Sequence, residues 1–160
     1  MRRRLALTLL VLCVSGLASA SVAASATRLP GFRSPSGNIS CLFIPSAPND
    51  SGSGRTPATL LCKIGHADYA KTLQDRCMGP SGAGVDWHGF TLSAARKATI
   101  NCSGGILYNP DTQRPTYVTL PYGKTWRQKM FSCSSRVTGI GCSNPNGHGL
   151  FISRQTWRVW

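Results

Sequence analysis

Short apolar and β-branched stretches alternate with turn-forming residues along most of this chain. Stretches of about four to eight such residues, bounded by Gly, Pro, Asn or Ser, are typical of β-strands. We expect strands over residues 39–44, 60–64, 98–102, 117–120, 130–134, 139–143, 150–153 and 157–160. The pattern therefore predicts an all-β domain, a small disulfide-bonded sandwich or barrel of seven or eight short antiparallel strands.

One segment shows helical spacing instead. Within residues 67–76 and just beyond, Tyr69, Leu73 and Cys77 share one face, and Asp68 is a candidate cap. The domain should thus contain at most one short helix. Residues 45–58 are rich in Gly, Ser and Pro with nothing apolar to bury, which indicates a flexible loop. Residues 21–31 resemble a short flexible leader.

The N-terminus has the composition of an export signal. Three arginines at residues 2–4 precede an apolar run over 5–14, and small residues then provide cleavage sites after Ala20 or Ala26. The apolar run is shorter than the roughly 20 residues that span a bilayer. We therefore expect a signal peptide over residues 1–26 and a single exported domain over 27–160, monomeric and without a transmembrane segment.

Cysteine usage supports an oxidising compartment. Cys13 lies inside the predicted signal, and six others remain: Cys41, Cys62, Cys77, Cys102, Cys133 and Cys142. An even set in a small exported domain predicts three disulfides. Six cysteines allow many pairings, but neighbour pairing (41–62, 77–102 and 133–142) is favoured, because the last pair flanks a turn. No Cys-x-x-Cys occurs, so we expect neither a metal ion nor a cofactor.

The net positive charge of the chain allows two interpretations. The chain has 18 Lys and Arg against five Asp and no Glu, and removing the three signal arginines leaves a net charge of +10. Such a field attracts polyanions such as nucleic acid, an anionic wall polymer or acidic lipid headgroups. The alternative is that the charge only keeps the protein soluble.

Aromatic and basic residues near the C-terminus are the candidate binding residues. Trp126 with Arg127, and Arg158 among nearby tryptophans, could stack on rings and pair with anionic groups, and Arg154 adds a further cation. The alternative is that the aromatic rings fill the core of a small β domain. On this basis the sequence favours a non-catalytic binding or structural module at the cell envelope, with an anionic polymer as the partner.

A small hydrolase is the second hypothesis. His148 lies between two glycines, and an imidazole there can act as acid or base with Asp86 or His88. A nuclease would need His66, His88 and His148 together, and nothing in their spacing brings them together. A third hypothesis, a structural or inhibitory module with a protein partner, predicts an exposed apolar patch.

Residues 32–41 and 131–142 echo each other. Each contains a Phe, a Ser-containing segment, and then Gly, Ile and Cys. We interpret the echo as shared hairpin chemistry, not as duplication.

Several motifs carry a family resemblance. They are Phe-Arg-Ser-Pro-Ser-Gly-Asn-Ile-Ser-Cys at residues 32–41, Leu-Pro-Tyr-Gly-Lys-Thr-Trp at 120–126, Phe-Ser-Cys at 131–133, Val-Thr-Gly-Ile-Gly-Cys at 137–142 and Gly-His-Gly-Leu-Phe-Ile-Ser-Arg at 147–154. With Asp86-Trp87 and the six cysteines, this chain resembles a family of exported domains of unknown function from actinobacteria. The resemblance implies an exported β domain and no particular activity.

Overall fold

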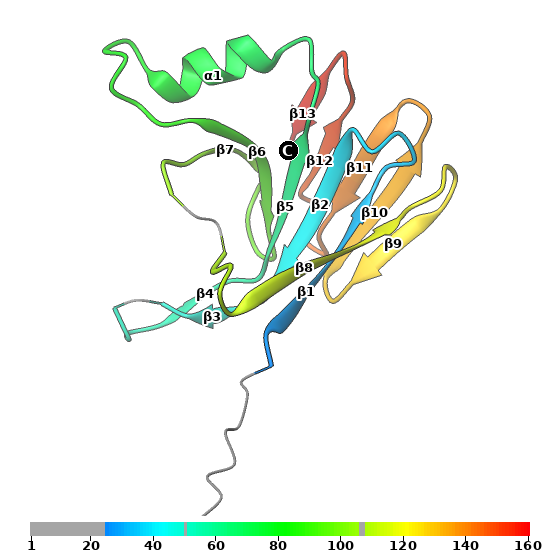
Figure 1. Cartoon of the computed structure of the whole chain (residues 1–160). Helices are drawn as coiled ribbons and strands as arrows, with labels where there is room; N and C mark the ends of the chain where they lie inside the picture. Colours follow the sequence, from blue (N-terminus) through cyan, green and yellow to red (C-terminus); the bar gives the residue numbers. More distant parts are fainter. Residues whose placement is uncertain (1–24, 50, 106–107) are drawn as a thin grey trace, which may run out of the picture.

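The computed structural model describes residues 25–49, 51–105 and 108–160. Within them the chain forms thirteen strands and one helix (Figure 1). In chain order these are β1 Thr27–Arg33, β2 Ile39–Ile44, β3 Ala47–Pro48, β4 Arg55–Thr56, β5 Thr59–Ile64, α1 Ala70–Met78, β6 Trp87–Ser93, β7 Thr99–Cys102, β8 Gln113–Thr119, β9 Thr125–Gln128, β10 Phe131–Arg136, β11 Gly139–Ser143, β12 Gly149–Ile152 and β13 Trp157–Val159.

Two sheets face each other across one core. The first has six strands in the order β7-β6-β5-β2-β1-β8, and the second has five in the order β13-β12-β11-β10-β9. The short strands β3 and β4 pair separately. Figure 1 shows the six-stranded sheet and the five-stranded sheet as two layers. The predicted all-β sandwich is therefore confirmed.

The core is made by alternate residues of strands from both sheets. In β2, Ile39, Cys41 and Phe43 belong to the buried cluster, as the two-residue period of a strand requires. Rings meet between the sheets: the Phe32 and Trp126 ring centroids are 5.1 Å apart, and those of Phe43 and Phe131 are 6.1 Å apart. These contacts hold one face of each sheet away from water.

Three disulfides join Cys41 to Cys62, Cys77 to Cys102 and Cys133 to Cys142. This pairing is the one that the sequence predicts. The first and third each link directly opposed residues of neighbouring strands, and they meet in the core. The sulfur atoms of Cys41, Cys62 and Cys142 lie within 4.8 Å of one another, so one disulfide from each sheet contributes to the centre of the sandwich.

Helix α1 packs on β6 near one edge of the six-stranded sheet. Leu73 and Cys77 are its buried residues, as the predicted face requires. Gln74 anchors it, because its Oε1 accepts a hydrogen bond from the Trp87 backbone N–H at 3.0 Å. Asp68 does not cap the helix: the N-cap is Tyr69 without a side-chain bond, and the Asp68 carboxylate is directed to Arg154 instead.

The structure departs from the expected strand set in several places. Strands β6 and β9 were not among the expected strands. Residues 27–31 of the predicted leader belong to β1. Residues 47–48 and 55–56 pair within the predicted loop 45–58. Strand β1 also runs parallel to β8, from Thr27 opposite Gln113 to Arg33 opposite Thr119, although only antiparallel pairs were expected. Gly31 leaves room on both sides of β1, since a Cβ there would lie 2.5 Å from the Cys41 carbonyl oxygen on β2 and 3.0 Å from the Tyr117 ring on β8.

Residues 1–24 of the predicted signal peptide lie outside the described residues. Among those that are described, no helix is both long enough and apolar enough to cross a bilayer.

Candidate functional site

A cleft of about 770 Å³ opens at one end of the sandwich. Turns from both sheets enclose it, because the β1–β2, β10–β11 and β12–β13 connections all end there. The segments after β5 and β8 complete its wall. Its lining residues are Ser34, Ser36, Gly37, Asn38, Ile39, Gly65, His66, Tyr122, Arg136, Val137, Thr138, Gly139, Ile140, Ser153, Arg154 and Gln155.

The β1–β2 turn is closed by its own polar groups. The backbone N–H of Gly37 donates to the Ser34 carbonyl at 2.9 Å, and that of Ile39 donates to Ser34 Oγ at 3.1 Å. Gly37 has φ +72°, a left-handed conformation that glycine adopts without steric cost. The sequence Ser-Pro-Ser-Gly therefore produces a tight turn with its backbone at the cleft.

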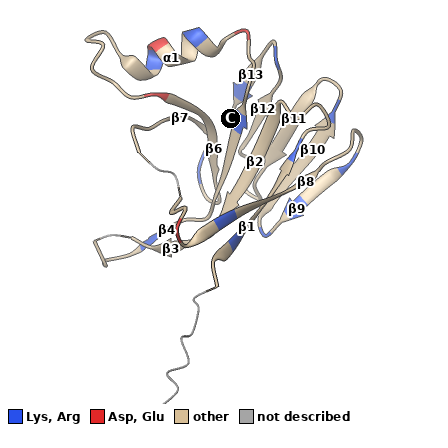
Figure 2. Cartoon of the chain, in the orientation of Figure 1, with Lys and Arg blue, Asp and Glu red and all other residues tan. Residues whose placement is uncertain are grey.

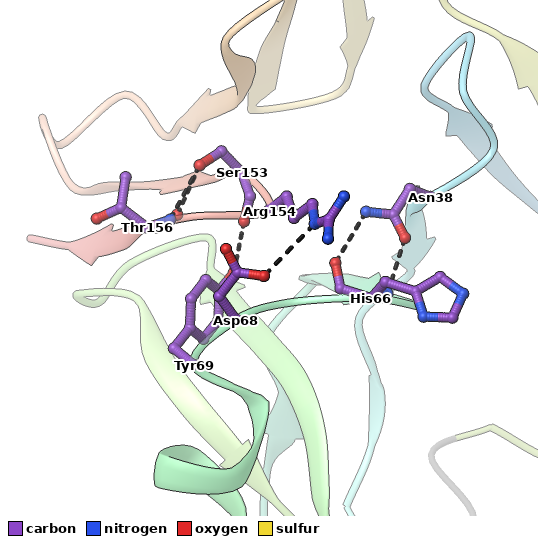
Figure 3. Close-up of polar contacts among 7 residues, drawn as sticks. All are labelled: Asn38, His66, Asp68, Tyr69, Ser153, Arg154 and Thr156. Carbon is purple, nitrogen blue, oxygen red and sulfur yellow. Dashed lines mark hydrogen bonds and ion pairs between the residues drawn. The ribbon is translucent and has the colours of Figure 1, made fainter.

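Asn38 ties this turn to the segment that leaves β5. Its Oδ1 accepts from the His66 backbone N–H at 2.8 Å, and its Nδ2 donates to the His66 carbonyl at 3.0 Å. Figure 3 shows this two-way bond beside the imidazole. Both bonds fix the backbone of His66, so the segment that carries the imidazole at the cleft is held in place.

Arg154 is positioned by the β12–β13 turn. Ser153 Oγ closes that turn by accepting from the Thr156 N–H at 3.0 Å, and Tyr69 Oη donates to the Ser153 carbonyl at 3.0 Å. Arg154 Nε donates to Asp68 Oδ1 at 3.4 Å (Figure 3). The two side chains are 67% and 58% exposed, so this ion pair orients the guanidinium while adding little stability.

Tyr69 supports the cleft as a permanent donor. Burial raises the pKa of its phenol to about 12. The hydroxyl therefore stays protonated, and able to donate to the Ser153 carbonyl, throughout the physiological range.

The charge of the cleft is one-sided. Arg136, Arg154 and His66 line it, and none of its described lining residues is acidic. The asymmetry extends to the whole five-stranded sheet. Residues 112–160 contain seven Lys and Arg and no Asp or Glu, because all five aspartates lie between residues 50 and 111. Figure 2 shows blue positions and no red on β9 to β13. An anion entering the cleft meets no carboxylate from the five-stranded sheet, and the Asp68 carboxylate that pairs with Arg154 comes from the segment before α1.

The predicted binding residues lie in three different places. Arg154 lines the cleft. Trp126 packs inward against Phe32, as the core alternative expects. Arg127 and Arg158 are exposed on β9 and β13, and the Arg158 guanidinium carbon lies 4.8 Å from the centre of the Trp160 ring. Only one of the four therefore belongs to the cleft.

His148 lies in the β11–β12 turn, away from the cleft. Its backbone N–H donates to Asn144 Oδ1 at 3.1 Å, while Asn144 Nδ2 donates to the Ser93 carbonyl at 2.9 Å. Ser93 is the last residue of β6 and His88 is its second, so the strand separates these ends by about 17 Å at roughly 3.3 Å per residue. His148 is thus not brought together with His88 or with Asp86, which precedes that strand.

Exposed apolar side chains do not gather into one patch in the described part of the chain. Tyr122 and Val137 line the cleft, whereas Val118 and Met130 belong to β8 and the β9–β10 turn. This distribution gives no support to a large apolar docking surface.

Sequence reasoning did not single out Arg136 or the serines of the cleft. They belong to separate turns, and only the fold brings these turns to one end. The echo between residues 32–41 and 131–142 was the available signal. Its two copies are the β1–β2 and β10–β11 hairpins, which pack face to face and whose turns both line the cleft.

Comparison with known proteins gives one match. The model of a family of unknown function, DUF6636, matches residues 9–159. No curated protein matches the chain. No solved structure matches it either.

Proposed function

Since this chain belongs to DUF6636, a family of unknown function that lends it no activity, we propose a function from the site itself: the protein is an extracytoplasmic module that binds an anionic polymer at its cleft. The observation that carries the proposal is the cleft with two arginines, a histidine and no carboxylate in its described lining. Hydroxyl and amide groups beside these cations provide further partners for anion oxygens.

The covalent structure supports the proposed compartment. Three disulfides persist in oxidising surroundings and are rare in the reducing cytosol. The predicted signal peptide over residues 1–26 would export the chain there. Together they support a place at or beyond the cell envelope, where anionic polymers are abundant partners for a basic protein.

Binding without catalysis fits the site best. His66 is an exposed imidazole in the cleft, and no carboxylate among the lining residues is available to orient it or share a proton. His148 stands in a separate turn. The cleft thus provides cations and hydrogen-bond groups but no acid–base pair, which favours recognition over hydrolysis.

The test is retention of the purified protein on immobilised heparin as salt rises. We expect the wild type to be retained at low salt and to elute as salt increases, because charge contacts weaken with ionic strength. The variant Arg136→Gln/Arg154→Gln should elute at clearly lower salt.

The matched control removes the same charge elsewhere. Arg28 and Arg114 are exposed and lie opposite each other at the other end of β1 and β8. Arg28→Gln/Arg114→Gln should elute close to the wild type. If the wild type is not retained on the heparin column at low salt, the proposal is refuted. If both variants lose retention equally, net charge alone explains the binding.

A further inference from the structure

A second concave surface lies on the outer face of the five-stranded sheet. Strand pairing places two rows of residues across this face. One row runs Thr125, Ser134, Gly141, Phe151 and Arg158. The other runs Arg127, Ser132, Ser143 and Gly149, and Trp160 continues it through its backbone bonds to Gly149. Arg127 on one side, and Phe151, Arg158 and Trp160 on the other, flank the small residues of β10 and β11.

A groove of about 310 Å³ follows from that arrangement. Its floor is Ser132, Ser134, Gly141 and Ser143, and its walls are Arg127 on one side and Trp160 on the other. The indole lies directly on the sheet, since a Cβ at residue 149 would come within 2.5 Å of the ring. Glycine at that position therefore lets the wall form.

The groove leads to the cleft along β10. Outward-facing residues alternate along a strand, so Ser132 and Ser134 are followed on the same face by Arg136, which lines the cleft. The four steps from residue 132 to residue 136 extend about 13 Å at roughly 3.3 Å per residue. Arg127 and Arg136 thus stand near opposite ends of one hydroxyl-lined path.

We propose that cleft and groove together bind one linear chain of hydroxylated units that carries regularly spaced anionic groups, namely a sugar or polyol phosphate polymer. This proposal rests on the proposed function, because it assigns the class of polymer to the same cationic site. Arg154 and Arg136 bind anionic groups at the cleft, and Arg127 binds another further along. The serine hydroxyls between them donate to and accept from the hydroxyl groups of the polymer.

Single-stranded nucleic acid is the competing polyanion, and the groove suits it less well. Such binding uses open aromatic faces on which bases stack. In Trp160 one face lies on the Gly149 backbone and the Arg158 guanidinium lies over the ring, 4.8 Å from its centre. The middle of the groove is small and polar, which fits hydroxylated units better than base stacks.

The experiment compares poly(glycerol phosphate) of about twenty units with oligomers of about three units and with oligo(dT) of equal charge, since only a long chain reaches both ends of the path. Ser134→Tyr fills the groove without changing charge, and Arg127→Gln removes its far cation. We expect each variant to weaken binding of the long polymer about five- to tenfold, that is by about 1 to 1.4 kcal/mol. Binding of the short oligomers at the cleft should change less than twofold.

Three outcomes separate the ideas. Thr112→Tyr adds the same ring at an exposed position before β8 and should leave all affinities unchanged. Wild-type affinity for the long polymer in both Ser134→Tyr and Arg127→Gln refutes the path while leaving the cleft intact. Tighter binding of oligo(dT) refutes the polymer class. Failure of the wild type to bind any of the three refutes the proposed function as well.

Discussion

At the scale of single residues, Tyr69 connects the helix side of the molecule to the cleft. Its ring packs 6.1 Å from Trp87 and 6.4 Å from Phe90 and Trp157, while its hydroxyl reaches the Ser153 carbonyl. One side chain thus belongs both to the aromatic core and to the turn that presents Arg154.

The raised pKa of Tyr69 predicts a pH dependence of stability. In the unfolded chain the phenol ionises near its ordinary pKa of 10.0, and in the folded protein near about 12. Tyr69 therefore contributes stability fully below pH 10, and the contribution is lost as pH rises toward 12. Urea unfolding should show the wild type losing more stability over this interval than Tyr69→Phe.

The comparison also contains its own control. At pH 7 the phenylalanine variant should lose only about 1 kcal/mol, the typical net value of one hydrogen bond. Parallel stability curves for the two proteins between pH 10 and 12 would contradict the assignment. Burial raises the pKa of Tyr117, Tyr108 raises it further, and Arg33 lowers it. Tyr117 is present in both proteins, so its contribution cancels in the comparison.

Some residue-level features were predictable and others were not. The disulfide between Cys133 and Cys142 was predictable, because a nine-residue separation across a turn places the two residues opposite each other. The surroundings of His148 were not, because they depend on Asn144 bonding to Ser93, 51 positions away. Flanking glycines show that a turn exists without showing what it faces.

At the scale of elements, α1 depends on one covalent bond to the sheet. The Cys77–Cys102 disulfide joins α1 to β7 across 25 residues, and Cys102 is exposed, unlike the cysteines of the other two disulfides. Helix α1 is nine residues long and has no side-chain cap. A helix this short has little stability of its own and depends on tertiary attachment.

Removal of that disulfide should loosen the helix before the sandwich. By chain entropy, Cys77→Ala/Cys102→Ser should lower the free energy of unfolding by about 3 kcal/mol. Hydrogen exchange should speed up in residues 70–78 while β2, β5 and β10 remain protected. The converse, uniform loss of protection in both sheets, would show that this bond supports the whole fold.

The strands also show how much of the secondary structure the pattern of apolar residues can predict. Alternation and turn residues located β2, β5, β11 and β12 to within about one residue, since these strands have a buried face and a turn at an end. Strands β1 and β6 were missed as strands because Pro30, Gly31 and Gly89 interrupt their apolar runs. In the structure, Gly31 makes room for Tyr117 and Gly89 forms a bulge near Trp87.

At the scale of the whole molecule, charge divides along the sandwich. The aspartates belong to the half of the chain that carries α1, and the five-stranded sheet is wholly basic (Figure 2). A polyanion should therefore bind in one preferred orientation, with the five-stranded sheet toward it.

Lysine acetylation in the presence and absence of poly(glycerol phosphate) measures that orientation. Lys124 and Lys129 flank β9, whereas Lys71 lies on α1, where it pairs with Asp75 at 2.8 Å, and Lys97 follows β6. The polymer should slow acetylation of Lys124 and Lys129 several-fold more than that of Lys71 and Lys97, since only the first two lie on the basic side. Equal protection of all four would contradict a fixed orientation.

The class of fold was accessible from the sequence, and its topology was not. Strand β1 pairs with β8 across more than eighty residues, so no local pattern reports the pairing. The cleft follows from the topology, because it exists only where the turns of both sheets end together. The net charge predicted an anionic partner, but only the fold gathers the aspartate-free C-terminal strands β9 to β13 into one sheet.

The three sulfurs that meet within 4.8 Å at the centre of the sandwich make correct oxidation a matter of timing. A wrong cross-link from Cys142 to Cys41 or Cys62 would need only a small displacement, so the assembled interior does not select the right partner. Loop closure does: Cys142 lies nine residues from Cys133 but 101 and 80 residues from Cys41 and Cys62, and the shorter loop costs less entropy. We therefore expect the β10–β11 hairpin to form its own disulfide before the two sheets pack together. If the chain collapses before it is oxidised, a wrong disulfide would form in the buried core, where a thiol from solution cannot reach it to exchange it.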